Sequence, residues 1–277
     1  MVARFSVLDN RPIAPAVHRL LIRAPRVARY WAPGQFAIVR VDGEGERIPL
    51  TVVDADDEEG TIVLVVQAVG YTTDRLVAVP AGGLLADVVG PLGRPSDIEW
   101  YGHVAVVGGG VGTAVAFPTA RALRQAGNRV SVIVGARTSN HVVLADEIRA
   151  SGCDLIVATE DGSLGVTGLV TDALGPLLAT GDIDRVVAAG PIPMMQAVAE
   201  QTRPLGIPTV VSLNPIMVDG TGMCGGCRVV VGGEMRFACV DGPEFDGHLV
   251  DFAGLALRNR TYLEAERAAR ERAGVPG

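Results

Sequence analysis

The chain has 277 residues, of which 48% are hydrophobic and 20% charged, and its formal net charge is −7 at pH 7. This length allows two domains and an appendage. The mean hydropathy is +0.33, yet glycines interrupt the longest weakly charged stretch, His103–Thr119, so we expect no membrane span. The basic residues, all arginine, form no stripe typical of nucleic-acid binding, so we expect no nucleic-acid partner. Because Met1–Ser6 lacks the apolar core of a signal peptide, we expect a cytoplasmic protein.

Residues 1–98 are predicted to be mostly β-structure. Runs rich in β-branched residues occur at 19–23, 35–41, 50–53 and 61–67. Turn-forming residues separate them, among them Pro33–Gly34, Asp42–Gly43 and the acidic segment Asp56–Gly60. Short strands at this spacing, with little helix between them, indicate a small antiparallel barrel.

Three stretches of this region are candidate binding elements. In the first, Arg47 is suited to a phosphate and Thr51 to a hydrogen bond with a ring, while Pro49 removes a backbone donor at a strand start. The second, Val69–Leu76, resembles a turn that enters a helix, and such helix N-termini bind phosphate. The third, Gly90–Gly93, is predicted to be a tight turn. Each fits an ordinary turn as well, and only their order along the chain favours a ligand site.

From His103 onwards the pattern changes to alternating strands and helices. The predicted strands are 103–107, 129–134, 155–158 and 185–189, and the predicted helices are the stretch ending at Arg124, 142–150, 170–178 and the segment after Gly190. This alternation indicates a parallel sheet with helices on both faces, and ligands of such sheets lie beyond the carboxyl ends of the strands. The segment Gly108–Gly112, Arg137, Asp161 and the Gly190 turn all occupy such ends.

The glycine-rich segment Gly108–Gly112 matches the dinucleotide fingerprint only approximately. Thr113 occupies the third glycine position, and the second strand ends at Arg137 rather than at an acidic residue. A strand-to-helix turn that binds a pyrophosphate is the favoured interpretation, and a turn required only for packing is the alternative. Cys153, at the start of the third strand, is interpreted as a buried structural thiol.

Three of the four cysteines lie in one glycine-rich segment near the C-terminus. Asp219, Cys224 and Cys227 follow the C-x4-C-x2-C spacing of plant-type 2Fe-2S ferredoxins with Asp in the first position, and Cys239 is the distant fourth ligand. A thioredoxin-like dithiol is disfavoured because the following residues continue as a strand. A zinc site of the three cysteines and His248 is the stronger alternative.

The residues after Cys239 are predicted to form turns and then a helix. Val240–Gly247 is rich in turn-forming residues, and residues 254–277 are predicted to form an Arg- and Glu-rich helix. A solvated helix is the simplest interpretation of this tail, and a docking surface for a partner subunit is the alternative.

Taken together, these motifs resemble the ferredoxin–NADP reductase superfamily along nearly the whole chain. Within it, the chain resembles the electron-transfer subunits of dihydroorotate dehydrogenase B, of sulfide dehydrogenase and of the NADH-dependent reduced ferredoxin:NADP oxidoreductase. The candidate FAD-binding residues are Arg47, Pro49, Leu50, Thr51, Gln67, Gly70, Thr72, Thr73, Gly90 and Gly93. The candidate NAD(H)-binding residues are Gly109, Gly110, Gly112, Arg137, Asp161, Gly190, Pro191 and Met194. The candidate cluster ligands are Asp219, Cys224, Cys227 and Cys239.

The resemblance implies four parts and an electron relay. The parts are an antiparallel FAD-binding β-barrel (1–98), a Rossmann-like NAD-binding α/β domain (99–210), a 2Fe-2S segment (211–252) and a C-terminal helix (253–277). Electrons are expected to pass between NAD(H), FAD and the cluster, to or from a larger glutamate-synthase-like subunit with flavin and 4Fe-4S centres. Ferredoxin would be reached through that partner.

One departure separates the candidate relatives. Dihydroorotate dehydrogenase B subunits usually carry Cys where this chain has Asp219, which favours a subunit of the electron-bifurcating ferredoxin:NADP oxidoreductase. A dihydroorotate dehydrogenase B or sulfide dehydrogenase subunit is the alternative, and a zinc-stabilised nucleotide-binding regulatory module is the alternative from another class. The sequence does not separate NAD from NADP, because Arg137 is placed where it could meet a 2′-phosphate.

Overall fold

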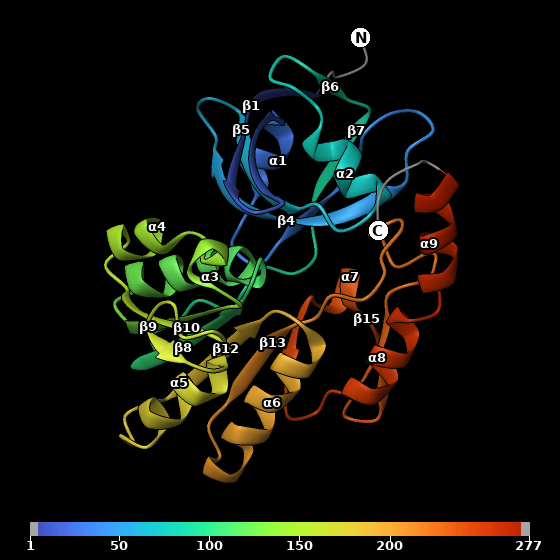
Figure 1. The fold of residues 1–277 in the computed structure, drawn as a ribbon. Helices are drawn as coiled ribbons and strands as arrows, with labels where there is room; N and C mark the ends of the chain where they lie inside the picture. The colour runs from blue at the N-terminus through green and yellow to red at the C-terminus, as the bar shows by residue number, and fades with distance from the viewer. Residues whose placement is uncertain (1–4, 273–277) are drawn as a thin grey trace.

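In the computed structural model, which describes residues 5–272, the N-terminal strands form one antiparallel sheet that curls into a barrel (Figure 1). The strand order is β6-β1-β2-β5-β4-β3-β7. The two edge strands are consecutive in the chain and joined only by Ala86, so the barrel is nearly closed. Its elements are β1 (Phe5–Ala14), β2 (Val17–Arg23), α1 (Pro25–Tyr30), β3 (Phe36–Arg40), β4 (Arg47–Asp56), β5 (Thr61–Gln67), α2 (Tyr71–Val77), β6 (Leu84–Leu85) and β7 (Asp87–Leu92).

The barrel core comes from the alternation of side chains along its strands. Leu20 pairs with Leu64 and Ile22 with Ile62 across β2 and β5, and all four side chains are fully buried. The antiparallel barrel predicted from the sequence is confirmed. The prediction missed β1 and α1, and it was wrong about the tight turn at Gly90–Gly93, because Gly90 and Leu92 lie in β7, whose Val89 and Leu92 pair with β3 on either side of a register shift.

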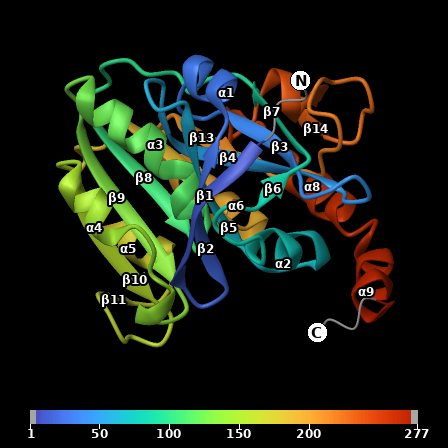
Figure 2. The same ribbon diagram turned by 90° about the horizontal axis from the view of Figure 1, so that it is seen from above.

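The second sheet is parallel apart from its last strand, and its order is β11-β10-β9-β8-β12-β13-β16. The strands are β8 (His103–Gly109), β9 (Arg129–Ala136), β10 (Asp154–Thr159), β11 (Val166–Thr167), β12 (Arg185–Ala189), β13 (Thr209–Ser212) and β16 (Glu244–Asp246). The helices are α3 (Gly112–Gln125), α4 (Ala145–Ala150), α5 (Val170–Leu178) and α6 (Ile192–Thr202). Helices α3 and α4 cover one face and α5 and α6 the other, as the predicted α/β arrangement requires (Figure 1; Figure 2 gives the view from above).

Two parts of the α/β region differ from the sequence prediction. The helix predicted at 142–150 begins only at Ala145. Leu144 has a positive φ of 59°, which a right-handed α-helix does not accommodate, so the helix cannot extend back through this residue. The segment predicted to be turn-rich after Cys239 contains a short helix, α7 (Ala238–Asp241), and then β16. Strand β16 pairs antiparallel with β13, so the C-terminal segment forms one edge of the sheet. Cys153 is buried, as predicted.

The C-terminal part packs against both preceding regions. It contains the hairpin β14 (Arg228–Val231) and β15 (Glu234–Phe237), followed by α7, β16, α8 (Phe252–Asn259) and α9 (Leu263–Arg272). Cys227, Cys239 and Leu255 share one buried cluster with Phe36 and Ile38 of the barrel. The tail predicted as a single helix is two helices, α8 and α9, which run along the right flank in Figure 1. The end of that prediction, 273–277, lies outside the described residues.

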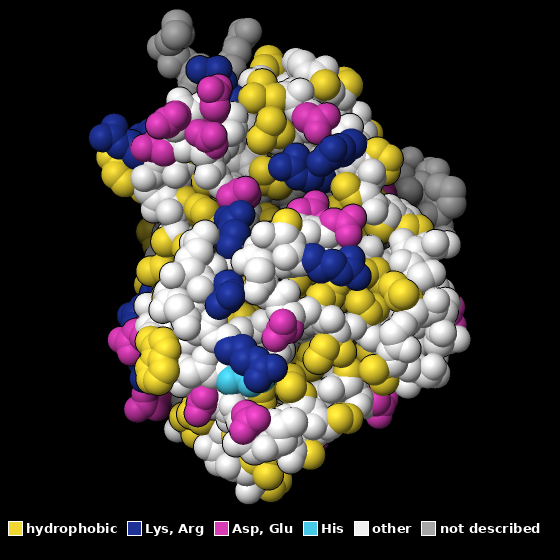
Figure 3. Space-filling view, turned by 90° about the vertical axis from the view of Figure 1, so that its left-hand side faces the viewer, with side chains coloured by type: hydrophobic (Ala, Val, Ile, Leu, Met, Phe, Trp, Pro, Cys, Tyr) yellow, Lys and Arg dark blue, Asp and Glu magenta, His cyan; other side chains and the backbone are white. Residues whose placement is uncertain are grey.

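None of the helices within residues 5–272 combines the length and the apolar character that crossing a bilayer requires. On the face drawn in Figure 3, arginines are interspersed with acidic and hydrophobic side chains. The arginines coloured there do not form a continuous stripe.

Three parts of the chain meet at Ser96. Its hydroxyl lies 2.7 Å from Thr119 Oγ1 in α3 and donates a 2.7 Å hydrogen bond to Glu244 Oε1 in β16. Its backbone N–H donates to Pro33 O, 2.7 Å away in the barrel. Burial raises the pKa of Glu244, and the hydrogen bond from Ser96 and the charge of Arg185 oppose that rise.

Glu244→Gln is expected to stabilise the protein at neutral and alkaline pH. Because the pKa of Glu244 is higher in the folded state, the free energy of unfolding falls as the pH rises from the pKa of the unfolded state, about 4.3, through the pKa of the folded state. Glutamine accepts the same hydrogen bond but cannot ionise. Thermal unfolding should show a gain of about 3 °C at pH 8 and less at pH 4. The exposed Glu234→Gln should show no such pH-dependent gain, and an equal gain at both pH values would contradict the assignment.

Candidate cofactor-binding site

A cavity of about 1060 Å³ lies between the barrel and the carboxyl ends of the parallel strands. Its volume exceeds the range of about 300–1,000 Å³ typical of small-molecule sites. The lining combines residues of β4 and β5 with residues that follow β8, β9, β12 and β13. One cavity of this size, with walls from two domains, is suited to two dinucleotides placed against each other.

Five of the predicted FAD residues line the barrel wall of this cavity. They are Pro49, Leu50, Thr51, Gln67 and Thr73. The first three lie on β4, opposite residues of β3, and proline leaves no unsatisfied N–H at this wall. Thr73 sits in the first turn of α2, where its Oγ1 accepts hydrogen bonds from the N–H groups of Val69 (3.0 Å) and Gly70 (2.9 Å).

The other five predicted FAD residues lie outside the cavity lining. The Arg47 guanidinium is 3.8 Å from the Asp87 carboxylate. Thr72 donates a 3.1 Å hydrogen bond to Glu46, and Gly70 is the N-cap of α2. The remaining two are Gly90 and Gly93, at the end of β7. Their assignment to FAD stays a prediction.

The opposite wall carries seven of the eight predicted NAD(H) residues, namely Gly109, Gly110, Gly112, Arg137, Gly190, Pro191 and Met194. A Cβ on Gly112 would overlap the backbone of Ala189 and Gly190. Gly110 has a φ of 56° and open space around its Cα. The turn therefore needs glycine for close packing at one position and for its conformation at another. It leads into a helix whose N-cap, Val111, offers no capping side chain, which leaves a site for anions.

Asp161 lies outside the cavity lining and holds a neighbouring loop instead. Its carboxylate accepts hydrogen bonds from Ser163 Oγ (2.6 Å) and Ser163 N (3.0 Å), which lower the pKa of Asp161. Ser163 Oγ in turn accepts from Ser139 N at 2.7 Å. His141, two residues further on, lines the cavity. Direct contact between Asp161 and NAD(H) stays a prediction, and the hydrogen bonds through Ser163 support a positioning role for Asp161.

The four predicted cluster ligands form two pairs. Cys227 Sγ and Cys239 Sγ are 3.2 Å apart and buried. Asp219 Oδ2 accepts a 2.7 Å hydrogen bond from the backbone of Cys224, whose thiol is exposed. Backbone N–H groups also donate to sulfur, from Gly226 to Cys224 and from Cys239 to Cys227, each at 3.5 Å. Such N–H···S bonds are among the interactions that tune iron–sulfur clusters.

This arrangement fits a two-iron cluster better than a single zinc ion. A zinc ion takes all four of its ligands around one point. Each iron of a 2Fe-2S cluster takes two protein ligands, which matches two pairs. His248, the fourth ligand of the zinc alternative, has its Nε2 3.0 Å from Thr202 Oγ1 on α6. The Cys224–Cys227 turn leads into β14 rather than a helix, which counts against the thioredoxin-like alternative.

Several cavity residues escaped the sequence analysis. His141, Glu160, Asn214, Met217 and Pro243 all line the cavity. Glu160 follows β10, and Asn214 follows β13 by two residues, so both obey the rule that ligands lie at the carboxyl ends of parallel strands. Met217 and Pro243 carry no comparable signal, because only the folding of the cysteine segment against the barrel brings them there.

Comparison with known proteins identifies the family. Residues 214–251 match the model described as the iron–sulfur cluster binding domain of dihydroorotate dehydrogenase B. The chain is 48% identical over 266 residues to a Thermotoga maritima protein named as a homolog of the dihydroorotate dehydrogenase B (NAD(+)) electron transfer subunit, with 96% of this chain and 94% of that protein aligned. The chain belongs to the dihydroorotate dehydrogenase B electron-transfer subunit family.

Other members and related structures agree with this family. The Geobacillus thermodenitrificans electron transfer subunit is 32% identical, over 87% of this chain and 95% of that protein. A solved structure of the NADH-dependent reduced ferredoxin-NADP oxidoreductase, reported with flavin-based electron bifurcation, superimposes with a TM-score of 0.93 at 46% identity, covering 98% of both chains. An Amycolatopsis cytochrome P450 reductase shares the fold (TM-score 0.62, 24% identity, 73% of this chain and 65% of that chain).

Membership in the electron-transfer subunit family confirms the recognition and the fold class predicted from the sequence. The chain is an oxidoreductase-type electron-transfer subunit with a ferredoxin-reductase-like barrel, a parallel sheet and an iron–sulfur domain. Family and fold together support the predicted cofactors, FAD, NAD(H) and a 2Fe-2S cluster.

Proposed function

We propose that this electron-transfer subunit passes electrons between NAD(H), FAD and a 2Fe-2S cluster, to or from a larger flavin- and iron–sulfur-containing subunit. The observation that carries the proposal is the single cavity with predicted FAD residues on one wall and predicted NAD(H) residues on the other. Met217 and Pro243 extend this cavity toward the cysteine segment, and Met217 shares a buried cluster with Cys227 and Cys239.

When bound, the cofactors would supply the redox chemistry, namely hydride transfer between nicotinamide and flavin and single-electron transfer between flavin and cluster. The chain's own residues bind and orient. Pro49, Leu50 and Thr51 form the wall for one ring system, and the Gly109–Gly112 turn receives a pyrophosphate at the start of α3. Met194 and Pro191 pack over the same turn. This chemistry requires no acid–base side chain.

We further propose that the larger partner is a glutamate-synthase-like subunit with flavin and 4Fe-4S centres, which transfers electrons with ferredoxin and NADP in a bifurcating complex. Two observations support it: the 46% identity over 98% of both chains to the bifurcating oxidoreductase, and Asp219 in place of a cysteine. The second candidate is a dihydroorotate dehydrogenase B partner, which the names of the relatives favour.

The first experiment is anaerobic purification with a visible spectrum and with iron, sulfide, zinc and flavin analysis, followed by NADH or NADPH. We expect FAD, about two iron atoms per chain and bleaching by NADH more than by NADPH. A colourless protein that holds zinc would overturn the proposal. The native complex, isolated with its partner, then separates the two candidates by reducing either ferredoxin and NADP or the dihydroorotate couple.

Asp219→Cys is expected to retain the cluster and to shift its midpoint potential, because ligand identity and charge set the potential of such clusters. Redox titration followed by electron paramagnetic resonance measures the shift. Asp146→Cys, at a carboxylate that is 96% exposed on α4, is the matched control and should leave the potential unchanged. An unchanged potential in Asp219→Cys would remove Asp219 from the ligand set.

A further inference from the structure

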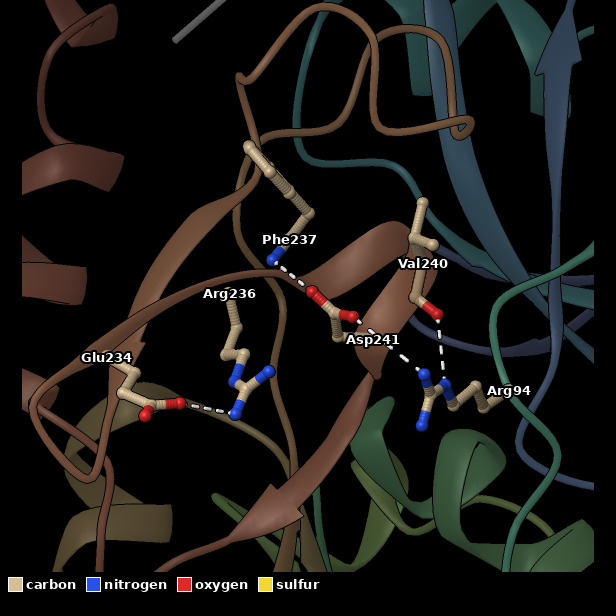
Figure 4. Close-up of polar contacts among 6 residues, drawn as sticks. All are labelled: Arg94, Glu234, Arg236, Phe237, Val240 and Asp241. Carbon is tan, nitrogen blue, oxygen red and sulfur yellow. Dashed lines mark hydrogen bonds and ion pairs between the residues drawn. The ribbon is translucent and has the colours of Figure 1, made fainter.

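The segment that leaves the barrel lies along the segment that follows Cys239. Arg94 N donates a 2.7 Å hydrogen bond to Gly242 O, and Arg94 Nε donates to Val240 O at 3.3 Å. The guanidinium also lies 3.9 Å from Asp241 Oδ1, as Figure 4 shows. These contacts, together with the hydrogen bond from Ser96 to Glu244, are called the barrel clasp below.

The clasped segment connects the two proposed redox sites. It begins immediately after Cys239, and its fourth residue, Pro243, lines the cavity. Gly93, at the end of β7, has no room for a side chain, since a Cβ there would lie 2.9 Å from Phe36 and 3.0 Å from Pro243. Five residues, Cys239–Pro243, therefore link a proposed cluster ligand to the wall of the proposed flavin site.

Both ends of this link are fixed by side chains. At the cluster end, Asp241 Oδ2 accepts a 2.8 Å hydrogen bond from Phe237 N across the helix that carries Cys239 (Figure 4). At the other end, Glu244 is held by Ser96, which also contacts Thr119 of α3. In between, Leu213 N donates to Pro243 O at 2.9 Å, which ties the link to the parallel sheet.

We propose that Arg94 and Glu244 are positioning residues for the electron step between flavin and cluster. Through the barrel clasp they fix Cys239–Pro243 and hence the separation of the two centres. In that step one electron leaves the reduced flavin and reduces the oxidised cluster by one; no bond to the chain forms or breaks. The inference rests on the proposed function, since it needs both cofactors bound.

The exposure of the Arg94 contacts argues for positioning rather than for stability. The side chain of Arg94 is 69% exposed, and exposed ion pairs contribute little to folding. Its loss should therefore leave a folded protein with both cofactors. Residues that orient the ligands of a metal centre typically change its properties by about tenfold or more when they are replaced.

The test compares Arg94→Gln, Arg94→Lys and Glu244→Ala in the full chain with both cofactors; alanine removes the carboxylate that accepts the hydrogen bond from Ser96. Stopped-flow spectroscopy with NADH follows flavin reduction and cluster reduction separately. We expect flavin reduction to stay unchanged and cluster reduction to slow about tenfold in Arg94→Gln and Glu244→Ala, and to slow less in Arg94→Lys. Hydrogen exchange of residues 238–244, measured without NADH, should become faster. Arg129→Gln removes a similarly exposed arginine, 3.5 Å from Asp154 in the other sheet, and should change neither rate.

Three results would overturn the inference. One is a rate of cluster reduction and a rate of hydrogen exchange that equal those of the wild type in both Arg94→Gln and Glu244→Ala. Another is an equal slowing of both steps, which indicates general damage. A wild-type protein without flavin or cluster refutes the proposed function, and the inference falls with it. If Glu244→Ala does not fold, the two Arg94 variants decide the question alone.

Discussion

Cys239→Ser should yield a protein that keeps FAD but loses its cluster. Cys239 is 2% exposed and its sulfur lies 3.2 Å from that of Cys227, so no nearby cysteine can replace it without moving the hairpin. Serine would offer iron an oxygen ligand, which is harder than a thiolate, and the serine hydroxyl is a weaker acid than the cysteine thiol. Iron and sulfide should fall from about two per chain to a small fraction, while NADH still bleaches the flavin.

Cys153→Ser is the matched control, because Cys153 is the one cysteine of the chain outside the candidate ligand set. Cys153 is also buried, and its thiol lies 3.8 Å from Ala120 O beneath α3. This variant should be less stable yet retain the full iron content. Loss of flavin together with iron in Cys239→Ser would mean that the residue supports the fold of the cavity instead of the cluster.

Gly112→Val should abolish most of the NADH-driven flavin reduction. A side chain there collides with the backbone of Ala189 and Gly190, and backbone cannot rotate away as a flexible side chain can. The start of α3 must move, and with it the proposed pyrophosphate site. Because a small misplacement costs about a hundredfold in such steps, stopped-flow reduction should slow by at least that factor. FAD content should stay unchanged.

Gly43→Val tests whether any glycine replacement has this effect. A Cβ at Gly43 meets no heavy atom within 4 Å. Its reduction rate should equal that of the wild type. Reduction by dithionite, which needs no nucleotide site, should remain normal in both variants. A normal NADH rate in Gly112→Val would show that the nucleotide does not use this turn.

The sequence predicted the elements whose signals are local. The strand Arg185–Ala189 and the helix Val170–Leu178 were predicted with the bounds observed. A buried parallel strand and an amphipathic helix can each be recognised from the hydrophobic pattern of a few consecutive residues. The glycine turn at Gly109–Gly112 was also predicted from a local signal, and it lines the cavity. The cysteine spacing likewise identified the segment that the family model matches.

What the sequence left out depends on contacts between distant segments. Strand β16 has only three residues, and it exists because Val210–Ser212 offers it a free edge. Pro243 and Met217 become cavity residues only when the cysteine segment packs against the barrel. The sequence spacing did not predict that the four candidate ligands form two pairs either. Spacing limits how far apart two residues can lie, but it does not set the direction in which their side chains point.

Strand β16 has a practical consequence for anyone who wishes to study the nucleotide domain alone. A chain shortened before residue 244 would lose the strand that covers β13. The exposed backbone of Thr209–Ser212 would then be open to pairing with another molecule, and such edges promote aggregation. The opposite edge is already short, since β11 has two residues. Point substitutions at the cysteines are therefore a safer route to a cluster-free protein than deletion of the C-terminal segment.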